Sequence, residues 1–239
     1  MQPKFKYKVQ ELEIVYEDNY CFVVNKPNNL IVHHSHYARN VDEESLVELL
    51  VKKGYVQPIP VHRLDRKTSG LILFVKNSEF VLPFQSLFET NQIGKVYVAL
   101  VRGYIDSLLK VNTPIKNERG NYKEALSFIK SVQKFEKDFS IPPYPKARYS
   151  VVMMQPITGR THQLRVHSNK ISHPIIGDHR YGNRHHNRYF EVELSLPNLF
   201  LHAYKLSFFH PYLDKRIVLK GSFPGFWSVI YDKNHSFNS

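Results

Sequence analysis

The chain has 239 residues, 42% of them hydrophobic and 13% aromatic, which is enough apolar material for the core of one large domain or two small ones. Its 33 Lys and Arg outnumber the 21 Asp and Glu, and the resulting net charge of +12 with a pI near 9.6 indicates a polyanionic partner. No run approaches ~18 apolar residues, and no apolar segment follows the basic N-terminus, so we expect a soluble cytoplasmic protein without a membrane span or signal peptide. Cys21 is the only cysteine, which excludes internal disulfides and CxxC metal sites and favours a reducing compartment.

The N-terminal part of the chain is expected to begin with a β-hairpin. Two β-prone runs within residues 12–27 flank Asp18 and Asn19, whose side chains favour turns. Residues 40–50 combine a capping residue, acids in the first turn and apolar residues at helical spacing, and Gly54 ends this predicted helix.

The next predicted elements are a buried strand and a helix whose start depends on a proline. A continuous apolar run at 71–75 predicts the strand. Residues 78–89 have a helical pattern, but Pro83 within a helix costs ~3 kcal/mol unless the helix begins there.

Strands dominate the rest of the chain, and they are clustered rather than alternating with helices. This clustering predicts an α+β fold with a largely antiparallel sheet, and no repeat or linker divides it. The predicted strands are 95–103, 125–132, 148–156, 199–204, 205–211 and 216–220, with a proline-rich surface loop at 139–146, a helix at 161–170 and a short helix near Phe226.

Positive charge is concentrated between Lys146 and Tyr189, where Asp178 is the only acid. The window holds eight cations and six histidines, namely Lys146, Arg148, Arg160, Arg165, Lys170, Arg180, Arg184, Arg188, His162, His167, His173, His179, His185 and His186. With interleaved tyrosines, it is typical of a groove for a nucleic acid backbone, although a solvated basic surface is the alternative. A metal site is disfavoured because carboxylate and cysteine ligands are nearly absent, and neither nucleotide-binding nor zinc deaminase motifs occur.

The stretch VHRLDRKTSG, residues 61–70, places the single carboxylate of Asp65 among basic side chains. An aspartate is a competent nucleophile at a base or at a sugar carbon, and a neighbouring arginine would keep it charged and oriented. A structural ion pair is the alternative, and spacing alone favours it. Two-carboxylate glycosidase chemistry lacks an obvious second acid beyond Asp178.

Four motifs resemble the pseudouridine synthases that act on large-subunit ribosomal RNA and transfer RNA. HRLDRKTSGLILF at 62–74 matches the signature around the family's catalytic aspartate, and GRTHQLRVH at 159–167, with HPIIGD and YG after it, matches a later signature. The K-x-Y element at 95–97 and the NKP motif at 25–27 complete the series. The resemblance runs from Leu12 to Trp227, so we expect an N-terminal extension at 1–11 and a catalytic domain at 12–239.

This resemblance implies a mixed, mainly antiparallel sheet with helices and loops flanking a central catalytic cleft. It makes Asp65 the nucleophile and Arg165 its partner, while Tyr97 stacks on the target uracil. The residues it implies for substrate binding are Leu164 on the other face of the base, Arg63 in the gap left by the flipped nucleotide, and Arg160, His162 and Lys95. The reaction that the resemblance implies is the isomerisation of a uridine to pseudouridine without metal or cofactor, by a protein expected to be a monomer.

Several motif residues also have structural interpretations. We expect His62 to hydrogen-bond within its loop, Gly70 to permit a turn, and Asp178 to fix the loop before Tyr181. His162 and Gln163 would cap the helix at 161–170 or touch RNA, with capping favoured, and Lys95 could be either an RNA contact or a solvated strand end.

The chain departs from the family pattern at Asn28-Asn29, where a glycine is usual, and asparagine is the side chain that best tolerates positive φ. The dozen residues before Leu12 leave no room for a further RNA-binding domain, so 140–146 and 183–190 are candidate insertions for target choice. This arrangement is most similar to the subgroup that modifies uridine 65 of transfer RNA. A ribosomal RNA target and a catalytically silent RNA-binding protein are the alternatives.

Overall fold

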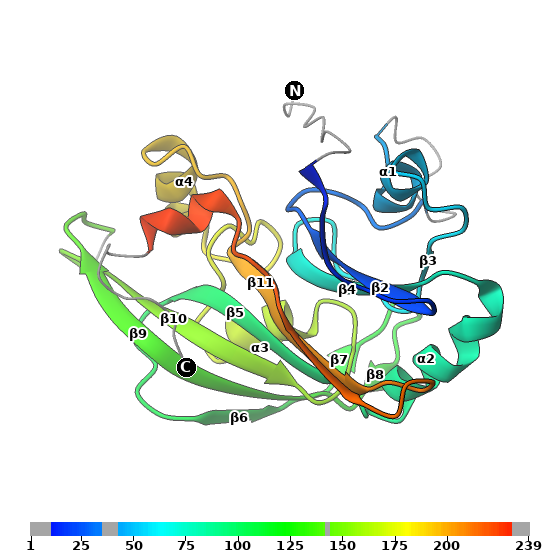
Figure 1. Ribbon diagram of the computed structural model, residues 1–239. Helices are drawn as coiled ribbons and strands as arrows, with labels where there is room; N and C mark the ends of the chain where they lie inside the picture. The colour runs from blue at the N-terminus through cyan, green and yellow to red at the C-terminus, as the bar shows by residue number, and fades with distance from the viewer. Residues whose placement is uncertain (1–10, 35–42, 142–143, 231–239) are drawn as a thin grey trace.

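The computed structural model describes residues 11–34, 43–141 and 144–230, and it has the α+β fold expected from the sequence (Figure 1). Ten of the described strands form one sheet, with the order β1-β2-β4-β11-β5-β10-β9-β6 and with β3 and β12 paired to β4 and β11, while β7 and β8 form a separate two-stranded sheet. The strands are β1 Glu13–Glu17, β2 Cys21–Lys26, β3 Ile59–Pro60, β4 Ser69–Val75, β5 Gly94–Arg102, β6 Leu109–Asn112, β7 Ile115–Lys116, β8 Tyr122–Lys123, β9 Leu126–Lys137, β10 Ala147–Pro156, β11 Leu201–Phe209 and β12 Arg216–Lys220. The helices are α1 Leu46–Lys52, α2 Val81–Glu89, α3 Gln163–Lys170 and α4 Arg184–Val192, with 3-10 turns at Ser78–Phe80 and Gly225–Val229.

A parallel contact joins the two halves of this otherwise antiparallel sheet. Strand β11 pairs with β4 in parallel through Ala203 and Gly70, and Ala203 also pairs with Tyr97 of β5. Gly70 has a φ of +112°, and a Cβ there would lie 2.4 Å from the carbonyl oxygen of Ala203. Glycine at this position therefore lets β4 come close to β11.

The predicted N-terminal hairpin is confirmed, and its turn is fixed by Asp18. The Asp18 carboxylate accepts hydrogen bonds from the backbone N–H groups of Tyr20 and Cys21, both at 2.8 Å. The NKP turn that follows β2 places Asn29 at a φ of +61°, so an asparagine does adopt the positive φ expected where the family has glycine. Lys26, the central residue of that motif, is completely buried.

Helix α1 begins later than the sequence pattern indicated. Its N-cap is Ser45, which forms a capping box with Glu48, so the acids at Glu43 and Glu44 precede the helix instead of filling its first turn. Residues 40–42 of the predicted helix lie outside the described residues. Gly54 follows the helix with a φ of +108°, as expected for a residue that ends one.

Helix α2 accommodates Pro83 because the proline is the third helical residue, where its missing N–H would have no partner within the helix. Helix α3 begins at Gln163, close to the predicted start. Helix α4 was not predicted, because its buried side chains include His186 and Asn187 and leave no clear apolar stripe.

The remaining differences concern strand length. Strand β9 runs to Lys137, five residues beyond its prediction, and the two C-terminal segments 199–204 and 205–211 form the single strand β11. The short strands β3, β6, β7 and β8 were not predicted, since two to four residues show no periodicity. The proline-rich loop is confirmed for its described residues, apart from a bridge between Ile141 and Tyr144.

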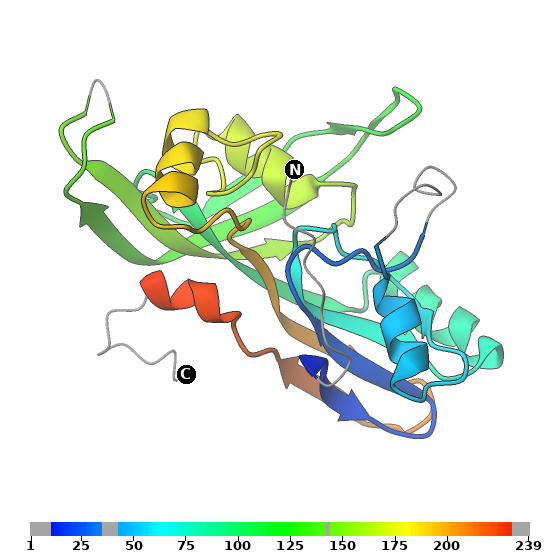
Figure 2. The same cartoon turned by 90° about the horizontal axis from the view of Figure 1, so that it is seen from above.

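The core consists of apolar clusters on both faces and in both halves of the sheet. Helix α3 and the C-terminal 3-10 turn lie on opposite sides of the sheet (Figure 2), and Phe190 of α4 belongs to the same apolar cluster as the turn. Leu164 of α3 packs with Ala99 and Val152, whereas Trp227 of the 3-10 turn packs with Val98 and Leu100. No helix among the described residues is long and apolar enough to cross a membrane.

Candidate active site

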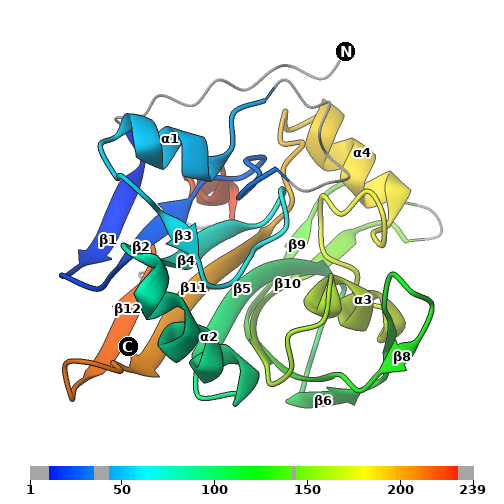
Figure 3. The same ribbon diagram turned by 90° about the vertical axis from the view of Figure 1, so that its right-hand side faces the viewer.

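The eight residues predicted for catalysis and substrate binding all line one pocket of about 470 Å³. They are Arg63, Asp65, Lys95, Tyr97, Arg160, His162, Leu164 and Arg165. The pocket lies between the end of α2 and the start of α3, with β5 between them (Figure 3). Its volume is within the range of sites that enclose a small molecule or a single base.

Asp65 lies in the turn between β3 and β4. The N–H of Thr68 donates to the Asp65 carbonyl at 3.0 Å, which closes the turn, and all seven residues of β4 behind it are buried. A loop backed by a buried strand is a rigid support for a reactive group. The Asp65 side chain remains 25% exposed, so it is accessible from the pocket.

Arg165 connects Asp65 to a second carboxylate. Its Nη1 donates to Oδ2 of Asp65 at 2.9 Å, while Nε and Nη2 donate to the two oxygens of Asp178 at 2.7 and 2.9 Å. Burial opposes the charge on Arg165, but the hydrogen bonds and charges of Asp178 and Asp65 outweigh it and raise its pKa. The guanidinium is therefore a fixed cation held from behind by Asp178.

This arrangement leaves one oxygen of Asp65 unoccupied. The two close nitrogen contacts of the carboxylate, from Arg165 and from His162, are both to Oδ2. Within the described part of the chain, Oδ1 accepts no hydrogen bond. The carboxylate is thus held through one oxygen while the other is available for chemistry.

Tyr97 and Leu164 supply the flat and apolar walls of the pocket. Tyr97 is on β5, and Leu164, which is 6% exposed, is on α3 next to Arg165. Burial and the charge of Asp65 raise the pKa of Tyr97, so its hydroxyl stays protonated at neutral pH. An aromatic ring and an aliphatic side chain in the lining of one pocket suit a planar ligand.

Three cations surround the mouth of the pocket. Arg63 and Arg160 are exposed, and Arg160 is oriented by an Nε hydrogen bond of 3.0 Å to the Glu124 carbonyl. Lys95 is half-buried, and burial lowers its pKa. A partly desolvated ammonium group in a basic pocket favours an anionic ligand such as a phosphate.

Lys26, the lysine of the NKP motif, supports the reactive turn, which the motif alone did not indicate. Its Nζ donates to the carbonyls of Pro27, Leu30 and Arg66 at 2.9, 2.9 and 3.0 Å. Burial lowers the pKa of Lys26 to about 7, and the charge of Asp65 opposes this shift. Because Arg66 follows Asp65 directly, Lys26 fixes the backbone of the reactive turn.

The structural role expected for His62 is confirmed, and so is the role of Asp178 in its loop. His62 accepts the Leu73 N–H at 2.9 Å, and burial lowers its pKa to about 3, so it is neutral. Asp178 accepts the N–H groups of Arg180 and Tyr181 at 2.9 and 3.0 Å. The bidentate pair with Arg165 is an additional function that the sequence did not indicate.

The capping role favoured for His162 is wrong. His162 has a left-handed backbone and makes no side-chain cap hydrogen bond. Gln163 instead orders the turn before α3, because its Oε1 accepts from the Arg160 N–H and the Thr158 hydroxyl at 3.0 and 2.7 Å.

Helix α4, which overlaps the predicted insertion at 183–190, also supports the site. Asn187 accepts the Gly177 N–H at 2.8 Å and donates to the Asp178 carbonyl at 2.9 Å. The opposite side of the helix exposes Arg184, His185 and Arg188. One short helix therefore holds the Asp178 loop and presents basic side chains to solvent.

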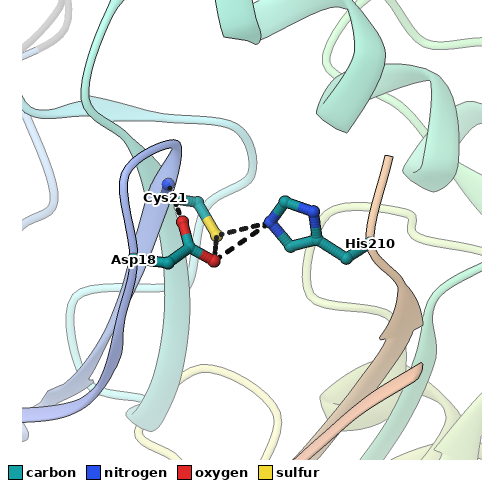
Figure 4. Close-up of side chains that lie close together, drawn as sticks. All are labelled: Asp18, Cys21 and His210. Atoms are coloured by element: carbon teal, nitrogen blue, oxygen red, sulfur yellow. Dashed lines mark hydrogen bonds and ion pairs between the residues drawn. The ribbon is translucent and has the colours of Figure 1, made fainter. Parts of the chain in front are cut away.

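A separate cluster of Asp18, Cys21 and His210 contains potential metal ligands (Figure 4). Nδ1 of His210 accepts the N–H groups of Tyr212 and Leu213 at 3.1 and 3.2 Å, so the ring proton is on Nε2. This nitrogen lies 3.1 Å from Oδ2 of Asp18 and has no lone pair for a metal. The cluster therefore fits a structural hydrogen-bond network between two hairpins.

The fold agrees with that of RNA pseudouridine synthases. A family model described as RNA pseudouridylate synthase matches residues 19–170, which include Asp65, Tyr97 and Arg165. The chain therefore belongs to the RNA pseudouridylate synthase family and is an isomerase that acts on RNA. The structure titled human RNA Pseudouridylate Synthase Domain Containing 1 superposes with a TM-score of 0.73 at 25% identity, covering 96% of this chain and 89% of that one.

Within this family, the chain is similar to proteins named tRNA pseudouridine synthase C. The Vibrio vulnificus protein is 33% identical over 233 residues, covering 93% of this chain and 95% of its own length. The Pasteurella multocida protein is 36% identical over 219 residues, which cover 87% of this chain and 90% of its own length. The resemblance inferred from the motifs is confirmed at the level of the family.

Proposed function

We propose that the protein converts uridine 65 of transfer RNA to pseudouridine, with Asp65 as the nucleophile. The observation that carries this proposal is the pairing of the Asp65 carboxylate with Arg165 through Oδ2 alone, in a pocket walled by Tyr97 and Leu164. The full-length similarity to proteins named tRNA pseudouridine synthase C supports a transfer RNA target. Position 65 rests on the resemblance of the sequence to one subgroup.

The roles of the pocket residues follow from how an enzyme reaches a base inside a helix. The uridine must leave the stack, and its uracil then lies between Tyr97 and Leu164. Arg63, exposed at the rim, fills the space left in the RNA, and Lys95 and Arg160 bind phosphates beside the target.

During the isomerisation the bond from N1 of the uracil to C1′ of the ribose breaks, and a bond from C5 to C1′ forms. The proton leaves C5 and a proton is gained at N1, so the atoms balance without a metal or redox cofactor. Attack on the base, attack on the sugar carbon and removal of a ribose proton all need a free carboxylate oxygen. Oδ1 of Asp65 meets this requirement because Arg165 occupies only Oδ2.

We propose further that residues 12–239 form the catalytic domain, preceded by an extension at 1–11, and that the protein acts in the cytoplasm as a monomer. Its exposed arginines on α4, Arg184 and Arg188, form part of the RNA contact surface. Replacing both with Ala is expected to weaken RNA binding and to reduce the slope of log affinity against log salt by about two. The control replaces the exposed Lys53 and Lys220 with Ala, which removes the same number of positive charges. If the two variants show equal salt slopes, Arg184 and Arg188 do not contact the RNA.

The proposal is tested by mapping pseudouridines in total RNA from cells with and without the gene, by carbodiimide modification and reverse transcription. Loss of the signal at position 65 of transfer RNA is the expected result. Loss of a pseudouridine in ribosomal RNA instead would support the proposed reaction but contradict the proposed transfer RNA target. If no site disappears and the purified protein leaves transcribed transfer RNA unmodified, the enzymatic proposal is wrong.

A further inference from the structure

His162 has a backbone conformation that needs an explanation. Its φ of 55° and ψ of 20° lie in the left-handed region, which is uncommon for residues other than glycine, although asparagine, aspartate and histidine adopt it more often than the rest. The conformation does not serve helix capping, because the His162 side chain makes no bond to the start of α3. It does place the imidazole in the pocket wall, between Tyr181 and Asp65.

The two ring nitrogens of His162 face different partners. Nδ1 lies 3.1 Å from the Tyr181 hydroxyl, and Nε2 lies 3.8 Å from Oδ2 of Asp65. The hydroxyl can donate to Nδ1, which leaves the ring proton on Nε2, directed at a carboxylate. The opposite tautomer would direct a lone pair at the carboxylate, which is electrostatically unfavourable.

Tyr181 is itself held by the catalytic arginine and its supporting loop. The guanidinium groups of Arg165 and Arg180 each lie 5.3 Å from the centre of its ring. Asp178 accepts the Tyr181 N–H at 3.0 Å. The tyrosine is therefore fixed by residues around Arg165, and its hydroxyl is linked to Asp65 through His162.

We propose that Tyr181 and His162 form a hydrogen-bond relay that positions the Asp65 carboxylate for the reaction, an inference that rests on the proposed function. Tyr181 fixes the tautomer of His162, and the Nε2–H of His162 acts with Arg165 on Oδ2, which keeps Oδ1 directed to the substrate. His162 is thus a positioning residue and not only a contact for RNA.

The charges around His162 agree with a neutral ring. Burial lowers its pKa, Asp65 opposes this, Arg165 and Arg180 lower it further, and Asp178 opposes it. The ring is therefore neutral at neutral pH and carries one proton, as the relay requires. The distance of 3.8 Å to Asp65 exceeds that of a hydrogen bond, and such contacts in ligand-free enzymes commonly shorten when substrate binds.

The test uses two small substitutions, Tyr181→Phe and His162→Asn, and their combination. Tyr181→Phe keeps the ring beside Arg165 and Arg180 and removes only the hydroxyl. Asparagine tolerates the left-handed backbone and can accept from Tyr181, but it is too short to reach Asp65. Tyr204→Phe is the matched control, because Tyr204 is also half-buried but lies outside the pocket lining and its hydroxyl makes no hydrogen bond within the described residues.

The first measurement is the nitrogen NMR spectrum of the histidine rings in the full chain without RNA, where His162 is assigned from the signal missing in His162→Asn. We expect the Nε2–H tautomer in the wild-type protein and a mixture of tautomers in Tyr181→Phe. An Nδ1–H tautomer in the wild-type protein would overturn the relay. This readout needs no enzymatic turnover, so it is independent of the proposed function.

The second measurement is single-turnover pseudouridine formation in transfer RNA, together with the Kd for the same RNA. Tyr181→Phe is expected to slow the bound reaction roughly tenfold, the scale lost when an orienting partner is removed, without changing the Kd. The double variant should be no slower than the slower single variant, since both changes break one relay. A wild-type rate in Tyr181→Phe, or effects that multiply, would refute the relay, whereas an inactive wild-type protein would refute the proposed function.

Discussion

Replacing Asp178 with Asn removes one charge from the centre of the site without changing the size of the side chain. The Asp178 side chain is 1% exposed and that of Arg165 is 10% exposed, and two hydrogen bonds of 2.7 and 2.9 Å join them. The amide has one oxygen acceptor, so it can no longer hold both Nε and Nη2 of Arg165 while accepting the backbone N–H groups of its loop.

The expected loss of stability is that of breaking a buried ion pair, about 3–5 kcal/mol, and the lower figure applies because Asn keeps some of the hydrogen bonds. A loss of about 3 kcal/mol corresponds to a fall in Tm of roughly 6–12 °C for a chain of this size. The folded state survives this change if its stability is in the usual range of about 5–15 kcal/mol. The released Arg165 is then free to pair with both oxygens of Asp65, which would block Oδ1 and displace the carboxylate.

The assay combines urea unfolding of Asp178→Asn with its single-turnover rate on bound transfer RNA. We expect a rate reduced on the order of 10²-fold, the scale of a displacement of about 1 Å in a reacting group, with little change in Kd. Asp106→Asn is the control, because Asp106 forms an ion pair with Lys134 at the surface and its side chain is 80% exposed. If Asp178→Asn unfolds at the wild-type urea concentration and turns over at the wild-type rate, the supporting role assigned to Asp178 is wrong.

Two further predictions concern stability. Gly70 has a φ of +112°, and the Cβ added by Gly70→Ala would lie 2.4 Å from the carbonyl oxygen of Ala203. Gly54 has nearly the same φ of +108°, but the Cβ added by Gly54→Ala would have no atom within 4 Å. In urea unfolding we expect roughly 1–2 kcal/mol of destabilisation for Gly54→Ala and at least 1–3 kcal/mol more for Gly70→Ala, and equal losses would exclude the close approach of β11. Burial lowers the pKa of His62 to about 3 and those of His186 and His202 to about 4, so below pH ~6.5 the unfolded chain binds more protons than the folded one. The free energy of unfolding should therefore fall between pH 6.5 and 4, by up to about 1.4 kcal/mol per pH unit for each histidine, and a constant value in urea titrations would contradict their burial as neutral rings.

The sequence predicted correctly which residues line the pocket, but it predicted few of the interactions between them. Asp65, Tyr97 and Arg165 lie in separate motifs up to 100 residues apart, and each is recognisable because its neighbours in the motif are distinctive. The geometry that unites them depends on β11, which pairs with both β4 and β5. Pairing of strands so distant in sequence leaves no local pattern, so it could not be predicted from residue spacing.

Supporting contacts were missed for the same reason. In the sequence alone, Lys26 has no feature that distinguishes it from a surface lysine. The pairing of β2 with β4 buries it, and its Nζ then donates to the carbonyl of Arg66. Helix α4 was missed because tertiary contacts, such as those of Asn187 with the Asp178 loop, replace the apolar stripe that identifies a helix in sequence. The hairpin turn at Asp18 was predictable because its hydrogen bonds are local.

The central claim is that the Asp65 carboxylate performs the reaction, and tritium release from C5 of uridine in transfer RNA tests it most directly. Purified wild-type protein should release the label from one uridine, at position 65. Asp65→Asn should release none while binding the RNA with the same Kd, and Asp138→Asn, at an exposed aspartate, should behave as wild type. If Asp65→Asn releases tritium at the wild-type rate, the Asp65 carboxylate is not the group that performs the reaction.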